Sequence, residues 1–180
     1  MGKVVIVTSS LRGKSNSDIL ANKVMEGAKE AGHDVEVISL KGKNIKFCIG
    51  CFTCAKTGEC VLKDDVKEML LKVKNADTLV FVTPIYYYEM SGQLKTFLDR
   101  MNPLYDSDYK FKNVYMVTCA WDTNIETPSR ALSGLQGWVE CFERAKFVDS
   151  IFLGGLNEPA EILEKTDSLE CAFEFGRRIK

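Results

Sequence analysis

Apolar residues along this chain follow two alternating patterns, and each pattern predicts a different kind of element. Short runs rich in apolar residues occupy residues 4–7, 34–40, 78–82, 114–119 and 147–153. Apolar residues at helical spacing occupy residues 16–31, 64–76, 91–101, 129–144 and 160–179. Continuous apolar runs are typical of parallel strands covered on both faces, whereas a period of three to four residues indicates an amphipathic helix. Five strands alternating with helices predict an α/β protein with a three-layer, doubly wound, five-stranded parallel sheet.

The first predicted strand ends abruptly in a polar loop, where small and hydroxyl-bearing residues precede the first helix. Ser15, Asn16 and Ser17 are each able to cap that helix. A helix start offers unpaired N–H groups and a positive dipole end, and Arg12 adds a positive charge. These features predict a site for a phosphate monoester, although neither common glycine-rich nucleotide motif is present. The alternative is an ordinary turn whose hydroxyls only cap the helix.

A second loop of distinctive composition follows the third predicted strand. Three consecutive tyrosines, residues 86–88, come after Pro84 and before the third helix. Aromatic side chains at a strand end favour binding of a flat ligand, while the alternative for any single ring is packing over a neighbouring helix. In a doubly wound sheet, ligands bind beyond the carboxyl ends of the strands. We therefore expect the loops after the first, third and fourth strands to converge on one site.

Four cysteines fall within a short segment before the second predicted helix. They follow the spacing Cys48-x2-Cys51-x2-Cys54-x5-Cys60. Three thiolates at intervals of three residues can reach adjacent corners of a cuboidal iron–sulfur cluster, and a fourth completes ligation by four cysteines. Structural zinc more often uses two separated cysteine pairs, so the cluster is favoured over zinc. Free or buried thiols are the alternative to both metals.

Composition narrows the classes of function and location. The chain has 180 residues, a formal net charge of −1 and no basic block, so no nucleic-acid partner is expected. No apolar run approaches the roughly eighteen residues that cross a bilayer, and the start of the chain lacks a signal-peptide pattern. We therefore expect one domain over residues 1–180, in the cytoplasm and without a membrane partner. Seven cysteines, an odd number, fit thiols or metal ligands in a reducing compartment.

The other three cysteines, the single histidine and two charged residues of the third helix are expected to have structural roles. Cys119, Cys141 and Cys171 fall on predicted strand and helix positions and are expected in the core. His33 is the only histidine, which leaves little support for a catalytic triad or a metal hydrolase, and we expect it in a solvated loop. The neighbours Asp99 and Arg100, on the third helix, are expected in salt bridges on a solvated face.

Taken together, these loops resemble those of the NAD(P)H-dependent FMN reductases of flavodoxin-like fold, including their iron–sulfur flavoprotein branch. The resemblance covers residues 3 to about 120. It rests on the motifs Ser10-x-Arg12-x-x-Ser15-Asn16-Ser17, Thr83-Pro84-Ile85-Tyr86 and Leu94-Lys95-x-Phe97-x-Asp99-Arg100. It implies the flavodoxin-like strand order 2-1-3-4-5. The cysteine spacing also matches the iron–sulfur branch, which implies that a [4Fe–4S] cluster is ligated by Cys48, Cys51, Cys54 and Cys60.

The resemblance also implies where FMN binds. In such proteins the first loop wraps the FMN phosphate and the third loop lies beside the isoalloxazine ring. By this resemblance, the FMN contacts are Ser10, Arg12, Ser15, Asn16, Ser17, Pro84, Ile85, Tyr86 and Tyr87. No side chain is expected to act as a catalytic acid or nucleophile, because the flavin carries the chemistry.

The activity that the resemblance implies is that of an FMN-dependent oxidoreductase. It takes a hydride from NAD(P)H and passes electrons to a flavin, quinone or iron–sulfur acceptor, which is a small molecule or a protein. One alternative is a flavodoxin-type or iron–sulfur flavoprotein electron carrier without a nicotinamide site, although a charge of −1 does not suit the acidic docking mode of long flavodoxins. Another is a metal or thiol sensor that works through its cysteines. A homodimer or homotetramer is expected, because in such proteins a neighbouring subunit completes the FMN site.

Overall fold

The computed structural model describes all of residues 1–180. Its strands are β1 (Lys3–Thr8), β2 (Asp34–Ser39), β3 (Thr78–Tyr86), β4 (Glu89–Met90), β5 (Asn113–Cys119) and β6 (Lys146–Leu153). Its α-helices are α1 (Asn16–Glu30), α2 (Thr53–Thr57), α3 (Val66–Lys74), α4 (Gly92–Asp99), α5 (Ser129–Glu140) and α6 (Thr166–Arg177). The short 3-10 helices are η1 (Asn102–Leu104) and η2 (Glu161–Glu164).

The five long strands form one parallel sheet, as the sequence pattern predicted. The strand order is β2-β1-β3-β5-β6, which is the expected order 2-1-3-4-5 once the two-residue β4 is set aside. β4 pairs antiparallel with the end of β3, where Ile85 is opposite Met90 and Tyr86 is opposite Glu89. The direction of winding reverses between β1 and β3, and doubly wound sheets bind their ligands outside the carboxyl ends of strands at such a point.

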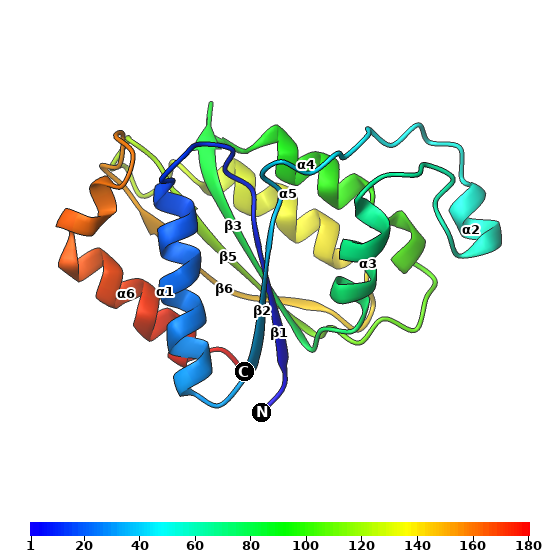
Figure 1. Cartoon of the computed structure of the whole chain (residues 1–180), viewed down its shortest axis with the longest axis horizontal. Helices are drawn as coiled ribbons and strands as arrows, with labels where there is room; N and C mark the ends of the chain where they lie inside the picture. The colour runs from blue at the N-terminus through cyan, green and yellow to red at the C-terminus, as the bar shows by residue number, and fades with distance from the viewer.

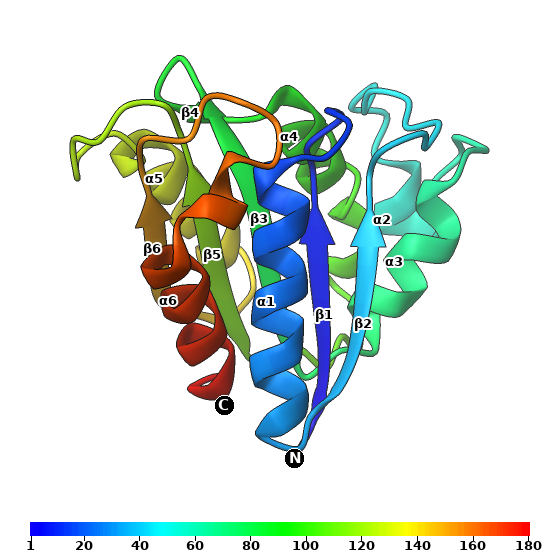
Figure 2. The ribbon, with the colours of Figure 1, turned by 60° about the vertical axis from the view of Figure 1, so that its left-hand side comes forward.

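Helices cover both faces of the sheet, which confirms the three-layer architecture (Figures 1 and 2). α1 and α6 lie on one face, and α3, α4 and α5 lie on the other. In β1, Val4 and Ile6 belong to the core under α1 and α6, whereas Val5 and Val7 belong to the opposite core. All four side chains are fully buried. Successive residues of a strand point to opposite faces of the sheet, so their burial requires that both faces are covered. Coverage on both faces explains the absence of polar alternation in this strand.

α1 and α6 approach each other closely, and two glycines allow the approach. A Cβ atom at Gly27 would lie 2.0 Å from the carbonyl oxygen of Phe173. A Cβ atom at Gly176 would lie 2.2 Å from the carbonyl oxygen of Val24. Both distances are far shorter than van der Waals contact, so each position admits only a hydrogen atom. The contact holds α6 against the helix whose first turn forms the candidate site.

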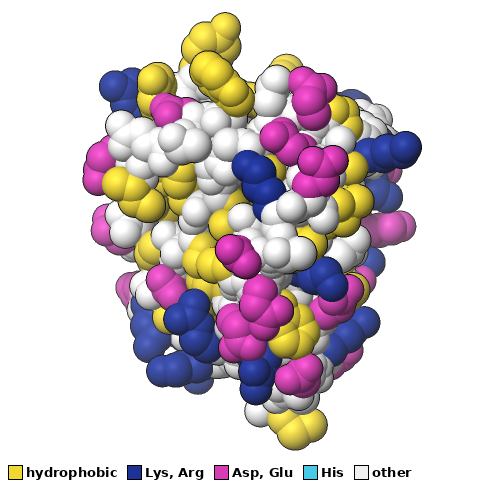
Figure 3. Space-filling model, turned by 90° about the vertical axis from the view of Figure 1, so that its left-hand side faces the viewer, with side chains coloured by type: hydrophobic (Ala, Val, Ile, Leu, Met, Phe, Trp, Pro, Cys, Tyr) yellow, Lys and Arg dark blue, Asp and Glu magenta, His cyan; other side chains and the backbone are white.

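The outer surface on the side of α6 carries acidic and basic side chains that are interspersed, without a block of one sign (Figure 3). This distribution agrees with the formal net charge of −1. None of the helices combines the length and the apolar character that crossing a bilayer requires.

The last helix and two cysteines differ from the sequence-based expectation. The helix was expected to begin near residue 160, but α6 begins at Thr166, because η2 precedes it and Lys165 leaves the helical conformation with φ −111° and ψ 77°. Within η2, the backbone N–H of Ile162 donates to the side chain of Asn16 at 3.1 Å, which ties this segment to the start of α1. Cys141 and Cys171 were expected in the core and are exposed instead, since they lie on the outer faces of their helices.

His33 also differs from expectation, because it is partly buried and hydrogen-bonded at both ring nitrogens. Nδ1 accepts from the N–H of Gly2 at 3.3 Å, and Nε2 lies 3.0 Å from the carbonyl oxygen of Ile179. The ring therefore joins the beginning and the end of the chain, which lie near each other in Figure 2. It has a structural role and lies at the opposite edge of the sheet from the candidate site.

Candidate functional site

A cavity of about 340 Å³ opens at the carboxyl edge of the sheet. Eight of the nine residues expected to bind FMN line it, namely Ser10, Arg12, Ser15, Asn16, Ser17, Pro84, Ile85 and Tyr86. The other lining residues are Cys119, Ala120, Trp121, Leu156 and Asn157. The loops after β1 and β5 therefore converge with the segment Pro84–Tyr86, which was predicted as a loop and forms the end of β3, and the loop after β6 joins them.

The loop after β1 supplies a run of free backbone donors. In residues 13–17, no backbone N–H group donates to an acceptor within the protein. Lys14 has a φ of 51°, a left-handed conformation of the kind that lets successive N–H groups converge on an anion. Ser15 caps α1, its hydroxyl accepting from the N–H of Asp18 at 3.3 Å. Together with the positive end of the α1 dipole, these donors form a site for a phosphate-sized anion.

The side chains of Asn16 and Ser17 hold the loops around this site. The amide nitrogen of Asn16 donates to the carbonyl of Glu158 at 2.9 Å, and its amide oxygen accepts from Ile162. The hydroxyl of Ser17 lies 3.2 Å from the sulfur of Cys119. Since these side chains are engaged with protein groups, the donors that Asn16 and Ser17 leave free at the cavity are their backbone N–H groups.

Leu156 and Asn157 complete the cavity, and sequence reasoning did not identify them. They come from the loop after β6, where the pair Gly154 and Gly155 marks a turn that could have indicated a site-forming loop. A Cβ atom at Gly154 would lie 2.6 Å from the carbonyl oxygen of Asp122, so the two loops pack closely. The guanidinium of Arg12 donates to the carbonyl of Asn157, which places a positive charge beside the free N–H groups.

Cys119 lies at the floor of the cavity, in the buried position expected for it. Burial raises the pKa of its thiol to about 11, although the nearby hydroxyl of Ser17 acts in the opposite direction. The sulfur is therefore a neutral thiol at physiological pH and has no nucleophilic role.

The tyrosine segment forms a tight hairpin rather than an open loop. β3 continues through Pro84 to Tyr86, and β4 begins at Glu89. Tyr87 and Tyr88 form the two-residue turn with φ values of 51° and 67°, a left-handed conformation in which such turns prefer asparagine and glycine. Tyr86 lines the cavity, whereas Tyr87 is 98% exposed at the tip and does not. The turn holds a strained backbone and an aromatic ring in solvent.

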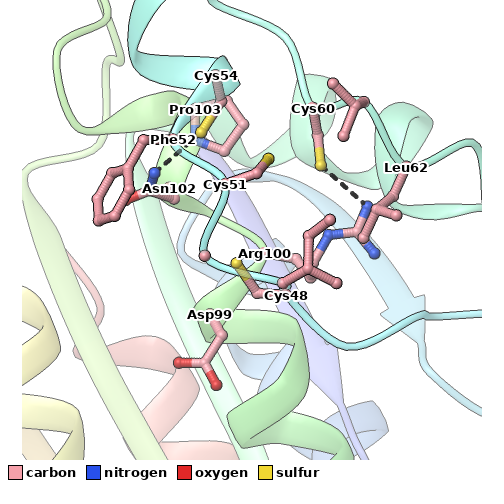
Figure 4. A pocket seen from close by; sticks show the side chains of 13 residues that line it. Cys48, Cys51, Phe52, Cys54, Cys60, Leu62, Asp99, Arg100, Asn102 and Pro103 are labelled. Atoms are coloured by element: carbon pink, nitrogen blue, oxygen red, sulfur yellow. Dashed lines mark hydrogen bonds between the residues drawn. The ribbon is translucent and has the colours of Figure 1, made fainter.

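A second cavity, of about 310 Å³, lies between the cysteine segment and the end of α4 (Figure 4). All four cysteines of the predicted cluster motif line it: Cys48, Cys51, Cys54 and Cys60. The segment contains one short helix, α2, that carries Cys54. Arg100 and Asn102, which follow α4, line the cavity beside the cysteines.

Two side chains donate hydrogen bonds to cysteine sulfurs in this cavity. The amide nitrogen of Asn102 lies 2.9 Å from the sulfur of Cys54. One terminal nitrogen of the Arg100 guanidinium lies 3.5 Å from the sulfur of Cys60. Figure 4 shows both contacts as dashed lines.

Arg100 forms a buried ion pair, where sequence reasoning expected a solvated one. Its two terminal nitrogens donate to the carboxylate oxygens of Asp64 at 2.6 and 3.1 Å, and the side chains are 1% and 0% exposed. Burial alone would raise the pKa of Asp64, but hydrogen bonds from Arg100 and from backbone N–H groups hold that pKa below its ordinary value. Asp99 does form the expected exposed pair, with Lys95 at 2.6 Å.

Four thiols line the cysteine cavity, and four cysteines are the usual ligand set of a [4Fe–4S] cluster. No three cysteine, histidine or carboxylate groups of the chain stand close enough to hold one ion, although four thiols surround one space. A zinc site would bring four ligands to about 2.3 Å from one point, whereas a cluster places its ligands at separate corners. The pKa of the Cys51 thiol is lowered because the hydroxyl and the N–H of Thr53 donate to its sulfur, which favours the thiolate that metals bind. The donor set therefore fits a [4Fe–4S] cluster.

A sequence comparison identifies the family that this fold and site define. The sequence model of the NADPH-dependent FMN reductases matches residues 2–136, which is most of the chain. The chain therefore belongs to the NADPH-dependent FMN reductase family.

Curated relatives include several iron–sulfur flavoproteins. One from Methanocaldococcus jannaschii is 38% identical over 102 residues, which cover 57% of this chain and 53% of that protein. One from Archaeoglobus fulgidus is 35% identical over 101 residues, which cover 56% and 46%. The chain thus spans about half the length of these relatives. One from Methanosarcina thermophila matches at 23% identity over 179 residues, which cover 98% of this chain and 93% of that protein.

Solved structures of similar fold support the architecture. An NAD(P)H:quinone oxidoreductase from Methanothermobacter marburgensis superimposes with a TM-score of 0.75 at 22% identity, covering 98% of this chain and 96% of that one. An azoreductase from Bacillus anthracis gives a TM-score of 0.73 at 17% identity, covering 99% and 100%. At these identities the likeness establishes the shared flavodoxin-like fold.

Proposed function

We propose that the chain is an FMN-dependent oxidoreductase that takes a hydride from NAD(P)H and passes electrons to a flavin, quinone or iron–sulfur acceptor. The observation that carries this proposal is the run of free backbone N–H groups at residues 13–17, at the positive end of α1. A monophosphate suits such a site, and the glycine-rich motif of dinucleotide-binding loops is absent. FMN supplies the hydride chemistry when bound, while the chain anchors the phosphate and orients the ring.

The mouth of the cavity favours access by a second flat molecule. Tyr86 and Trp121 line the cavity, and their side chains are 52% and 75% exposed. Their rings offer flat apolar surfaces at the mouth for a nicotinamide or an acceptor. The Cys119 thiol at the floor stays neutral, so it does not compete as a nucleophile with hydride transfer.

Stopped-flow mixing tests the activity. FMN-loaded protein is mixed without oxygen with NADPH or NADH, and the flavin absorbance is followed. We expect saturable bleaching by at least one of the two nucleotides. Bleaching by dithionite but by neither nucleotide would show instead an electron carrier without a nicotinamide site.

We propose in addition that Cys48, Cys51, Cys54 and Cys60 hold a [4Fe–4S] cluster. Support comes from the cavity that the four cysteines share and from the names of the iron–sulfur flavoprotein relatives. The cluster would supply one-electron chemistry when bound. α4 joins the two cavities: its N-cap Ser91 donates to Ser9 beside the flavin loop at 2.8 Å, and Arg100 at its other end lines the cysteine cavity.

We also propose that the working unit is a homodimer or homotetramer in which the hairpin tip contacts a second copy. Tyr87 presents almost its whole side chain to solvent, and its backbone is in a conformation that tyrosine adopts at a cost. An exposed aromatic patch on a strained turn is typical of a surface with a binding role.

A further inference from the structure

We propose that Arg100 and Asn102 are positioning residues that donate hydrogen bonds to Cys60 and Cys54 and thereby raise the reduction potential of the iron–sulfur centre. The inference rests on the [4Fe–4S] cluster proposed above. The two residues lie in one short stretch after α4, and each contacts the sulfur of a different cysteine. They are the side-chain donors that approach the cysteine sulfurs from outside the cysteine segment.

Arg100 also joins the two ends of the cysteine segment by hydrogen bonds. One nitrogen of Arg100 donates to the carbonyl of Lys46 at 2.7 Å, before the first cysteine, and the guanidinium also pairs with Asp64, after the last. Asp64 in turn accepts from the N–H of Lys46 at 2.9 Å. Because these bonds form within the protein alone, the donor to Cys60 is in place before any metal enters.

The arginine retains one unused donor. Its Nε is buried and has no hydrogen-bond partner in the protein, although a buried unpaired N–H costs about 1–3 kcal/mol. The Nε atom has no exposed surface, so the donor that reaches the cysteine cavity is the terminal nitrogen that contacts Cys60. A cationic group beside four thiols fits an anionic occupant.

Electrostatics fixes the direction of the effect. Reduction adds one electron to the centre without forming or breaking a bond, so the reduced centre is the more negative of the two. A guanidinium and an amide N–H that face its sulfur ligands stabilise the reduced form more than the oxidised form. Loss of either donor should therefore lower the reduction potential.

Asn102 gives the cleaner test, because its side chain is exposed and its removal leaves the core intact. In Asn102→Ala, we expect the one-electron reduction equilibrium of the centre to fall about tenfold, which corresponds to about 59 mV to lower potential. The measurement is a potentiometric titration followed by electron paramagnetic resonance, with the bound FMN as an internal reference. The matched control is Asn75→Ala, since the Asn75 amide donates to the carbonyl of Leu71 and reaches no cysteine.

The role of Arg100 is tested with a double variant that leaves no buried charge unpaired. The double variant Asp64→Asn with Arg100→Gln removes both members of the ion pair, and we expect a lower cluster potential with FMN affinity unchanged. An unchanged cluster potential in both the Asn102 and the double variant would overturn this inference while leaving the cluster itself established. If the parent protein takes up no cluster on anaerobic reconstitution, the cluster proposal fails, and the inference that depends on it fails too.

Discussion

At the scale of single residues, the two candidate sites are built largely from polar groups whose partners lie far away in the chain. Asn16 is hydrogen-bonded to the loop after β6, and Arg100 is paired with a carboxylate 36 positions earlier. Sequence patterns report periodic burial, so they do not reveal such long-range polar pairs. Arg100 was therefore misjudged as a solvated residue, and the hydrogen bonds of the Asn16 side chain to the loop after β6 were not foreseen.

The free N–H groups at residues 13–17 predict strong discrimination between FMN and riboflavin. Two charge-assisted hydrogen bonds to the phosphate, each of about 1.5 kcal/mol, give FMN an advantage of about 3 kcal/mol. Calorimetry should therefore show at least about 100-fold tighter binding of FMN than of riboflavin. Arg12→Ala should weaken FMN by about tenfold and leave riboflavin unchanged, since only the phosphate is expected to sense the added charge. Equal binding of the two flavins by the parent protein would refute the phosphate site.

The buried pair of Asp64 and Arg100 predicts a pH-dependent loss of stability. Asp64→Asn leaves the guanidinium without its counter-charge and should lower the free energy of unfolding by about 3 kcal/mol at neutral pH. The pKa of Asp64 is lowered in the folded state, so the carboxylate's contribution is full above the ordinary aspartate pKa of about 3.9 and is lost as the pH falls through the folded value. Urea titrations of the parent and the variant should therefore converge in acid.

Asp99→Asn is the matched control for that experiment. Asp99 forms an exposed pair with Lys95, and such pairs contribute less than about 1 kcal/mol. If the Asp99 and Asp64 variants lost equal stability at neutral pH, the buried pair would not be the special interaction described here.

At the scale of elements, the packing of α1 on α6 depends on the glycines at the crossing. Gly27→Ala should destabilise the protein by about 3 kcal/mol, because the added Cβ would collide with backbone atoms that cannot move independently. Gly137→Ala is the control: Gly137 lies in α5 with no atom within 4 Å of an added Cβ. There alanine should stabilise the protein by about 0.5–1 kcal/mol through its better helix propensity. Thermal and urea unfolding should give opposite signs for the two variants.

In the β3–β4 hairpin, residues that favour the turn should stabilise the chain but weaken the association of copies. Replacing Tyr87 by Asn and Tyr88 by Gly gives the turn its preferred residues and should stabilise the isolated chain by about 1–2 kcal/mol. If the hairpin tip contacts a second copy, the same change should shift the oligomer toward monomer in light scattering. Tyr87→Phe retains both the ring and the strain and should leave assembly unchanged. A double variant that associates as strongly as the parent would remove the hairpin from the interface.

At the scale of the whole molecule, the architecture could be predicted from the sequence, but the residues that distant segments contribute to each cavity could not. Buried parallel strands leave continuous apolar runs, which is why the strand order and the three layers were predicted correctly. The predicted start of α6 was wrong, because hydrogen bonds of Asn16 and Lys165 hold the preceding segment against other loops. The cysteine spacing indicated shared ligation, and the four thiols do surround one cavity, but the contributions of Arg100 and Asn102 depend on the end of a different helix.

The two cavities are made by different segments of the chain, so a change in one should be separable from a change in the other. The cavity at the carboxyl edge of the sheet is formed by the end of β3 and by the loops after β1, β5 and β6, whereas the cysteine cavity is formed by the segment after β2 and the residues at the end of α4. The two lists of lining residues share no member. A change in one cavity should therefore spare the ligand of the other.

The most direct test of this account is a count of FMN, iron and acid-labile sulfide in protein prepared without oxygen. The parent chain should contain about one FMN, four iron and four sulfide ions. Cys54→Ala should lose the iron and sulfide and retain FMN, because the phosphate site lies on a different loop. A preparation that binds FMN but neither contains nor takes up stoichiometric iron and sulfide would show that the cysteines are thiols, and one that binds no FMN would contradict the account at its centre.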